Sequence, residues 1–95
     1  MNKYESIFIV NPNVEEEGLK ALEEKFTTLI NSDGKVESVE NMGKKKLAYE
    51  IKKNTEGYYV VIDFEAKPEF ISELERIYRI TDGVMKFITI RKDEE

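Results

Sequence analysis

The sequence contains no cysteine and no histidine among its 95 residues. Without cysteine the chain forms neither disulfides nor thiolate ligands, and without histidine it lacks the usual general base and the commonest zinc ligand. Thiol redox chemistry and zinc sites with sulfur or imidazole ligands are therefore excluded. We expect a cytoplasmic protein that uses no cofactor and no metal ion.

Long apolar runs are also missing. The longest, from Tyr58 to Ile62, is far shorter than the roughly 20 residues that span a bilayer. The first residues, Met1 to Glu5, lack the basic and then apolar order of a signal peptide. We therefore expect a chain that is neither exported nor embedded in a membrane.

The length allows one small domain. Domains usually contain about 100 to 150 residues, so this chain has no room for a second core. We expect a single domain over residues 1–95, in which the charged end, residues 92–95, frays as a short tail.

Two segments have the period of amphipathic helices. The first is predicted from Val14 to Ser32, with Asn13 and Glu16 at the spacing of a capping box and Asp33-Gly34 as a left-handed stop. The second begins with Pro68 in its first turn and ends before Thr81-Asp82-Gly83. The apolar stripes are Leu19, Leu22, Phe26, Leu29 and Ile30 in the first helix, and Phe70, Ile71, Leu74, Ile77 and Tyr78 in the second.

Strands are predicted between these helices and at both ends of the chain. Residues Lys3 to Val10, Lys35 to Lys52, Tyr58 to Phe64 and Val84 to Arg91 are rich in β-branched and aromatic side chains. Gly43 indicates a bulge inside the long second strand, and Asn54 to Gly57 is predicted as the hairpin turn. The order βαββαβ is the split βαβ arrangement, which predicts an α+β, ferredoxin-like fold with a four-stranded antiparallel sheet and two helices on one face.

The strands are apolar on both faces, although two helices cover only one. We assign six residues to the face beneath the helices: Phe8, Val10, Val60, Ile62, Phe64 and Phe87. Six others are assigned to the open face: Ile7, Ile9, Tyr59, Val61, Ile88 and Ile90. Alternation alone does not say which set lies outside. An exposed apolar patch marks a protein interface or a base-stacking platform, unless the central strands are simply apolar on both sides.

Catalytic patterns are missing. The many carboxylates fall at spacings typical of solvated helix faces. A phosphate-binding loop would need a glycine where Ser38 precedes Gly43-Lys44, and an enzyme of the acylphosphatase type would need an arginine in the Asn11-Pro12-Asn13 loop. We therefore expect no enzymatic activity and no small-molecule substrate.

The charges are segregated along the chain. The net charge is −5, yet Gly43 to Lys53 and Arg76 to Lys92 each carry five bases against one acid. These two segments hold a net +8, and the remaining 67 residues hold −13. A basic stripe beside aromatic residues is typical of a nucleic-acid binder, and the alternative is that strand-edge lysines only prevent aggregation.

The segment Gly43–Lys52, a glycine and three lysines followed by Leu-Ala-Tyr-Glu-Ile-Lys, resembles the signature of the bacterial small-subunit ribosomal protein six family. Tyr4-Glu5, Asn11-Pro12, Gly57-Tyr58 and the run from Arg79 to Asp82 also match residues of that family. The resemblance covers essentially the whole chain. It implies a cytoplasmic protein of the small ribosomal subunit that binds the central domain of the small-subunit ribosomal RNA together with small-subunit ribosomal protein eighteen.

The resemblance and the residue patterns together suggest two sets of contacts. For RNA we expect Lys44, Lys45, Lys46, Arg79, Lys86 and Arg91. For the protein partner we expect the open-face residues Ile7, Ile9, Tyr59, Val61, Ile88 and Ile90. Tyr49 is expected to be either a packing residue or a contact residue, and packing is favoured. The alternative function is a ferredoxin-like regulatory or ligand-binding domain that forms a homodimer through its open sheet.

Overall fold

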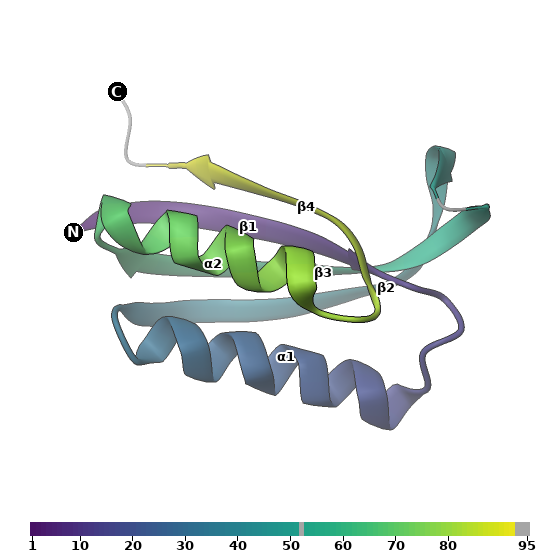
Figure 1. Cartoon of the computed structure of the whole chain (residues 1–95), viewed down its shortest axis with the longest axis horizontal. Coiled ribbons are helices and arrows are strands. Elements are labelled where there is room, and N and C mark those ends of the chain that lie inside the picture. Colours follow the sequence, from purple (N-terminus) through teal and green to yellow (C-terminus); the bar gives the residue numbers. More distant parts are fainter. Residues whose placement is uncertain (52, 93–95) are drawn as a thin grey trace.

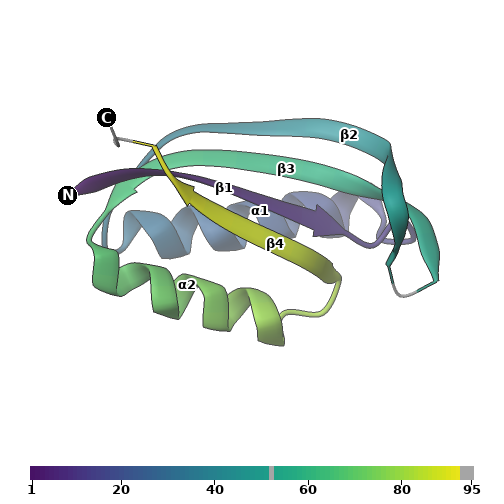
Figure 2. The ribbon, with the colours of Figure 1, turned by 90° about the horizontal axis from the view of Figure 1, so that it is seen from above.

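The computed structural model describes residues 1–51 and 53–92. Its elements follow the predicted order βαββαβ (Figure 1). They are β1 (Asn2–Val10), α1 (Glu16–Asn31), β2 (Lys35–Ile51), β3 (Asn54–Ala66), α2 (Pro68–Ile80) and β4 (Val84–Arg91). The strands form one antiparallel sheet in the order β2-β3-β1-β4, and both helices lie on the same face of it (Figure 2). The predicted ferredoxin-like α+β fold is confirmed.

The structure settles which apolar set lies beneath the helices. Five side chains of the assigned set are completely buried there: Phe8, Val10, Val60, Ile62 and Phe64. The sixth, Phe87, is half-buried and stacks on Tyr78 of α2, with ring centroids 5.1 Å apart. The open face therefore carries the other set, as predicted.

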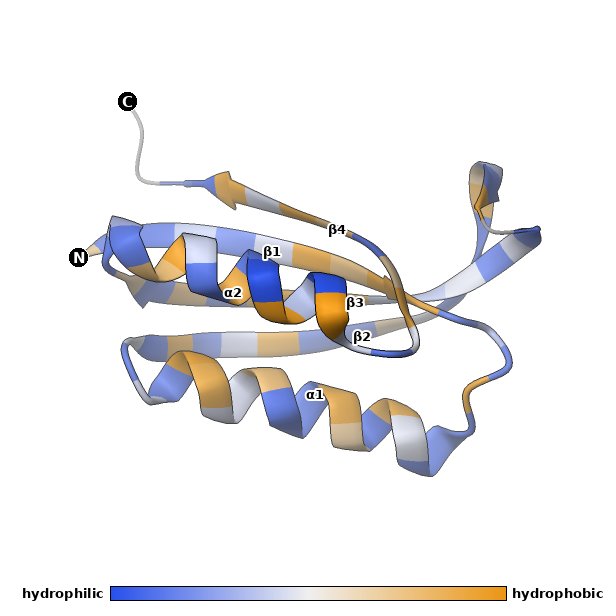
Figure 3. Ribbon diagram, in the orientation of Figure 1, coloured by the Kyte–Doolittle hydropathy of each residue, from blue (hydrophilic) through white to orange (hydrophobic). Residues whose placement is uncertain are grey.

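A cluster of three aromatic rings joins the sheet to both helices. The ring of Phe8 on β1 lies 5.1 Å from Phe26 on α1 and 5.2 Å from Tyr78 on α2, and the two helix rings are 4.4 Å apart. Such pairs contribute about 0.5 to 1.5 kcal/mol each beyond the burial of their area. Apolar and polar segments alternate around both helices (Figure 3), which lets each bury one side and solvate the other.

One buried polar network crosses this core. The hydroxyl of Ser6, which is fully buried, lies 2.7 Å from the Tyr78 hydroxyl and 3.2 Å from the Thr89 hydroxyl. Burial raises the pKa of Tyr78, and its hydrogen bond with Ser6 lowers that pKa by less. The phenol therefore stays protonated and able to donate. In the described part of the chain, every buried side-chain polar atom has a hydrogen-bond partner.

The ends of α1 differ from the prediction. The helix begins at Glu16, its N-cap residue Glu15 makes no side-chain capping bond, and the predicted capping box is wrong. The Asn11 side chain instead accepts the amide of Asn13 at 2.8 Å, a local turn bond that keeps Asn13 outside the helix. Gly34 is not left-handed either. A Cβ there would lie 2.2 Å from the carbonyl oxygen of Glu65, so glycine is needed for close approach of β3.

The hairpin between β2 and β3 turns earlier than predicted. Ile51 pairs with Asn54, so the expected turn at Asn54 to Gly57 is wrong and those residues belong to β3. The left-handed residue at the turn is Lys53, with φ 66°, a conformation that its side chain gives no reason to expect. Gly43, with φ 83° and a register shift beside it, is confirmed as a bulge.

The chain beyond β4 is described only at Lys92. The Lys92 amide donates to the Lys3 carbonyl oxygen at 2.7 Å, and its ammonium lies 3.1 Å from an Asp63 carboxylate oxygen. Residue 52 of the expected second strand and residues 93–95 of the expected tail lie outside the described residues.

Replacing Tyr78 with phenylalanine tests the buried network. Tyr78→Phe keeps the ring stacking but leaves the buried Ser6 hydroxyl with Thr89 as its remaining side-chain partner. We expect the free energy of unfolding to fall by about 1 to 2 kcal/mol in urea denaturation, because a buried polar group loses a partner.

Tyr58→Phe is the matched control. That ring is only half-buried, so water compensates for its lost hydroxyl and stability should change by less than about 0.5 kcal/mol. Equal stability of Tyr78→Phe and the wild type would show that the network contributes nothing.

Candidate functional site

The distal part of the β2–β3 hairpin forms an arm, defined here as residues 43–51 and 53–57. At about 3.3 Å per residue the 17 residues of β2 would extend roughly 56 Å, yet the domain is 37 Å long. The strand must therefore bend. It does so at Gly43, beside a register shift, and pairing is irregular again between Lys46 and Ile51. The arm extends past the end of β1 and turns up toward the β4 edge (Figure 1).

The arm contacts β4 through Tyr49. The Tyr49 hydroxyl accepts a hydrogen bond from the Lys86 ammonium, which also lies 4.9 Å from the centre of the Tyr49 ring. A second contact joins Asn54 to the Met85 sulfur at 3.4 Å. Tyr49 is 60% exposed, so it packs at the surface against Lys86 and not in the core, and a contact with RNA or protein stays a prediction.

A shallow apolar hollow of about 300 Å³ lies between the arm and the open face of the sheet. Ile7 of β1 and Ile88 of β4 line it from the sheet, and Leu47 and Tyr49 line it from the arm. Leu47 is itself buried, at 8% exposure. The arm therefore converts a flat apolar sheet face into a concave one, which is the shape of a binding site.

The structure brings all six predicted partner residues together on the open face. Ile7 stands opposite Val61 and Ile88, and Ile9 stands opposite Tyr59. Ile88 and Ile90 are 52% and 45% exposed, and Ile7, Tyr59 and Val61 are half-buried. Ile9 is only 8% exposed, in part because it packs on Gly57, and it offers the least surface of the six.

The structure gathers some of the predicted basic residues but not all. Lys44, Lys45 and Lys46 are exposed together on the arm, whose Tyr49 contacts Lys86. Lys44 lies 5.5 Å from the Tyr58 ring centre, and Lys46 stands opposite Glu56, so part of its charge is offset. The arm end of the sheet therefore holds four of the six predicted cations.

The remaining two cations lie elsewhere. Arg79 is on α2, with its guanidinium 4.0 Å from Glu75 and 5.6 Å from the ring centre of Phe87. Arg91 stands opposite Tyr4 at the far end of β4, five residues beyond Lys86 and so about 17 Å away along the strand. The basic residues do not form one continuous stripe.

Sequence reasoning missed the contribution of Leu47 and Tyr49 to the hollow. A signal was present: the predicted second strand is far longer than the predicted third strand with which it pairs. The excess length has no partner in a flat sheet, so it has to leave the sheet plane. Because the strand bends at Gly43, the residues after Gly43 could have been predicted to lie over the open apolar face.

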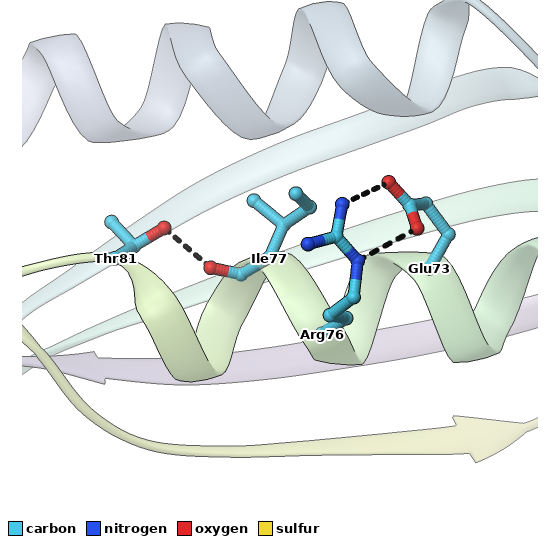
Figure 4. Close-up of polar contacts among 4 residues, drawn as sticks. All are labelled: Glu73, Arg76, Ile77 and Thr81. Carbon is cyan, nitrogen blue, oxygen red and sulfur yellow. Dashed lines mark hydrogen bonds and ion pairs between the residues drawn. The ribbon is translucent and has the colours of Figure 1, made fainter.

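Glu73, Glu75 and Asp63 form surface ion pairs in the structure. Arg76 makes two hydrogen bonds to Glu73, which lower the pKa of that carboxyl (Figure 4). Beside them the Thr81 hydroxyl donates to the Ile77 carbonyl oxygen and closes α2. Over residues 1–51 and 53–92 no group of three or more acidic side chains is arranged to hold a metal ion. No helix in this range has the length and apolarity to cross a membrane.

The fold and surface define a class of protein: a small ferredoxin-like binding module with an apolar open sheet and a lysine-bearing arm. The family model for ribosomal protein S6 matches residues 3–91. The small ribosomal subunit protein bS6 of Clostridium novyi is 50% identical over 95 residues, 99% of this chain and 100% of that protein. That of Clostridium kluyveri is 53% identical over the full length of both chains. The crystal structure of 30S ribosomal protein S6 from Thermotoga maritima has a TM-score of 0.91 at 43% identity, covering 96% of this chain and 87% of that one.

The chain belongs to the ribosomal protein S6 family, which confirms the resemblance seen in the sequence. Family membership makes it a protein of the small ribosomal subunit and not an enzyme. The predicted location, at the ribosome in the bacterial cytoplasm, follows from the same membership and is confirmed.

Replacing Gly43 tests how the arm bends. Among the described residues no atom lies within 4 Å of the place a Cβ would occupy, so any cost comes from the backbone, whose φ of 83° disfavours alanine. We expect Gly43→Ala to lower the free energy of unfolding by about 1 kcal/mol in urea denaturation. Gly43→Asn should cost less, because asparagine tolerates left-handed backbone. If alanine and asparagine cost the same, the bend does not depend on this conformation.

Proposed function

We propose that this protein binds the central domain of the small-subunit ribosomal RNA together with small-subunit ribosomal protein eighteen, and so supports assembly of the platform of the subunit. The observation that carries the proposal is the pairing of two surfaces on one domain. The exposed lysines of the arm supply positive charge, and the hollowed open face beside them supplies apolar surface. Family membership gives these surfaces their setting on the ribosome.

The RNA contacts are assigned to the arm first. Lys44, Lys45 and Lys46 are consecutive and exposed, so at least two faces of the strand carry an ammonium. Arg79 and Arg91 are proposed as outlying contacts because they are exposed at other points of the domain. Flexible ammonium groups neutralise phosphates without reading base edges, so recognition rests on the shape of the RNA.

The protein contact is assigned to the open face. Ile88 and Ile90 leave about half of their surface in solvent, and the hollow beside Ile7 is almost wholly apolar. A partner that covers these residues removes apolar surface from water, which is the main driving force of association. The residues outside the two basic segments carry a net charge of −13, which repels RNA. A protein that binds at the same time would compensate for the weak overall attraction between this domain and RNA.

A salt series tests the RNA assignment. The triple variant K44A/K45A/K46A should bind a transcript of the central RNA domain, in complex with protein eighteen, more weakly than the wild type. It should also reduce the slope of log affinity against log salt by up to about three, because each lost phosphate contact releases roughly one counterion fewer. Filter binding between 50 and 200 mM salt measures both.

The matched control removes equal charge from the rest of the domain. Lys20, Lys35 and Lys67 are exposed outside the two basic segments, and K20A/K35A/K67A should leave the slope unchanged. Equal losses of slope in both triple variants would contradict the arm assignment and point to net charge alone.

Two exposed isoleucines test the protein assignment. Ile88 is 52% exposed on the open face, and Ile80 is 64% exposed at the end of α2. We expect Ile88→Asp to weaken binding of purified protein eighteen at least tenfold, about 1.4 kcal/mol, because a carboxylate would be buried against apolar surface. Ile80→Asp should bind like the wild type. Calorimetric titration measures both affinities.

Sedimentation of the isolated protein distinguishes the alternative function. A homodimer that forms without RNA and is abolished by Ile88→Asp would make the open face a self-interface. A monomer at all concentrations, together with the loss of protein eighteen binding, supports the proposed assignment.

A further inference from the structure

Tyr49 and Lys86 belong to strands at opposite edges of the sheet. The strand order is β2-β3-β1-β4, so two strands separate them. At about 4.8 Å between neighbouring strands, the edges of a flat sheet would be roughly 14 Å apart. Their contact therefore exists only because the arm turns across the end of the sheet.

One interaction holds the Lys86 ammonium to Tyr49. It donates a hydrogen bond to the Tyr49 hydroxyl, and it lies 4.9 Å from the ring centre on the hydroxyl side of the ring. The position of Lys86 is fixed by pairing with Ile9 in the centre of the sheet. The lysine is thus anchored in the rigid part of the domain, and the tyrosine is carried by the arm.

The arm also reaches β4 through Asn54, whose side chain lies 3.4 Å from the Met85 sulfur, but Tyr49 is the contact nearer to the lysines along β2. Tyr49 comes three residues after Lys46, so whatever holds Tyr49 also sets the direction of the three lysines proposed to meet RNA. Lys86 was expected to contact phosphate itself. In the structure its ammonium donates one of its three hydrogens to Tyr49, so a contact with phosphate would form beside that bond.

We propose that Lys86 is a positioning residue: through Tyr49 it holds the arm in the direction in which Lys44, Lys45 and Lys46 meet RNA. This inference rests on the proposed function. It assigns to the Tyr49–Lys86 pair a role in RNA binding without contact with the RNA.

The first test needs no RNA. In the free full-length protein, Tyr49→Leu and Lys86→Met should both lower the NMR order parameters of backbone amides 47–51, from about 0.85 for rigid backbone to below about 0.7. Lys86→Arg should keep the wild-type values, because arginine keeps a charged donor for the Tyr49 hydroxyl. Lys20→Met, at an exposed position on α1, is the control and should change nothing. Unchanged order parameters in both Tyr49→Leu and Lys86→Met would overturn the inference.

The second test uses the central-domain transcript with protein eighteen. Tyr49→Leu and Lys86→Met should each weaken binding about three- to tenfold with an unchanged salt slope. The double variant should be no weaker than either single variant, because both remove one interaction. Lys86→Arg should bind like the wild type.

Other outcomes overturn the inference in recognisable ways. A slope that falls by about 0.7 to 0.9 in Lys86→Met alone would make Lys86 a phosphate contact. Losses that add in the double variant would make Tyr49 a direct contact with the RNA or with protein eighteen. If wild-type protein and K44A/K45A/K46A both fail to bind, the proposed function itself is wrong. If Tyr49→Leu and Lys86→Met bind as tightly as the wild-type protein while K44A/K45A/K46A binds more weakly, the function stands and the positioning role does not.

Discussion

The constraint on which the rest of this structure depends is that the two central strands are apolar on both faces, whereas the helices cover only one. Phe8 and Val60 are completely buried beneath α1 and α2, while Ile7 of β1 and Val61 of β3, on the other face, are only half-buried. Beside them Ile88 of the edge strand β4 leaves half its surface in water. Burying that face contributes roughly 25 cal/mol per Å² of apolar surface, and this domain has no third layer of its own to do it. The open face is therefore the apolar surface that the proposed protein partner would cover.

The sequence predicted what depends on local periodicity and composition. Alternation in β1 and β3 and the stripes of the two helices follow from side chains repeating with the pitch of the element, and these were confirmed. The ends were predicted less well, since they depend on contacts between distant segments. Gly34 is a glycine because Glu65 approaches it, and Lys53 takes a left-handed conformation because β2 and β3 must join there. Neither the close approach at Gly34 nor the left-handed backbone of Lys53 can be predicted from the residues next to them in the sequence.

The same division applies to the candidate site. Residues of the open face were grouped correctly because period two puts alternate strand residues on opposite faces, although the period alone did not say which face the helices cover. The Tyr49–Lys86 contact was not, because it joins residues 37 positions apart, on opposite edges of a sheet. The positions of the basic residues were predicted in part. Their segregation along the chain was visible in the sequence, but the structure distributes them among the arm, α2 and the far end of β4.

The arm is where the two surfaces of the domain are linked. Leu47 and Tyr49 face the hollow, and three lysines precede them in the same strand, so one short segment forms the wall of the apolar site and carries the positive charge. A partner that packs against the hollow would restrict the arm, and an arm already restricted loses less conformational freedom on meeting RNA. Cooperative binding of a protein and an RNA would then need no direct contact between them. It requires only that the protein and the RNA contact opposite sides of one element whose motion is limited. Strand β2, which bends at Gly43 and contacts Lys86 through Tyr49, has those properties.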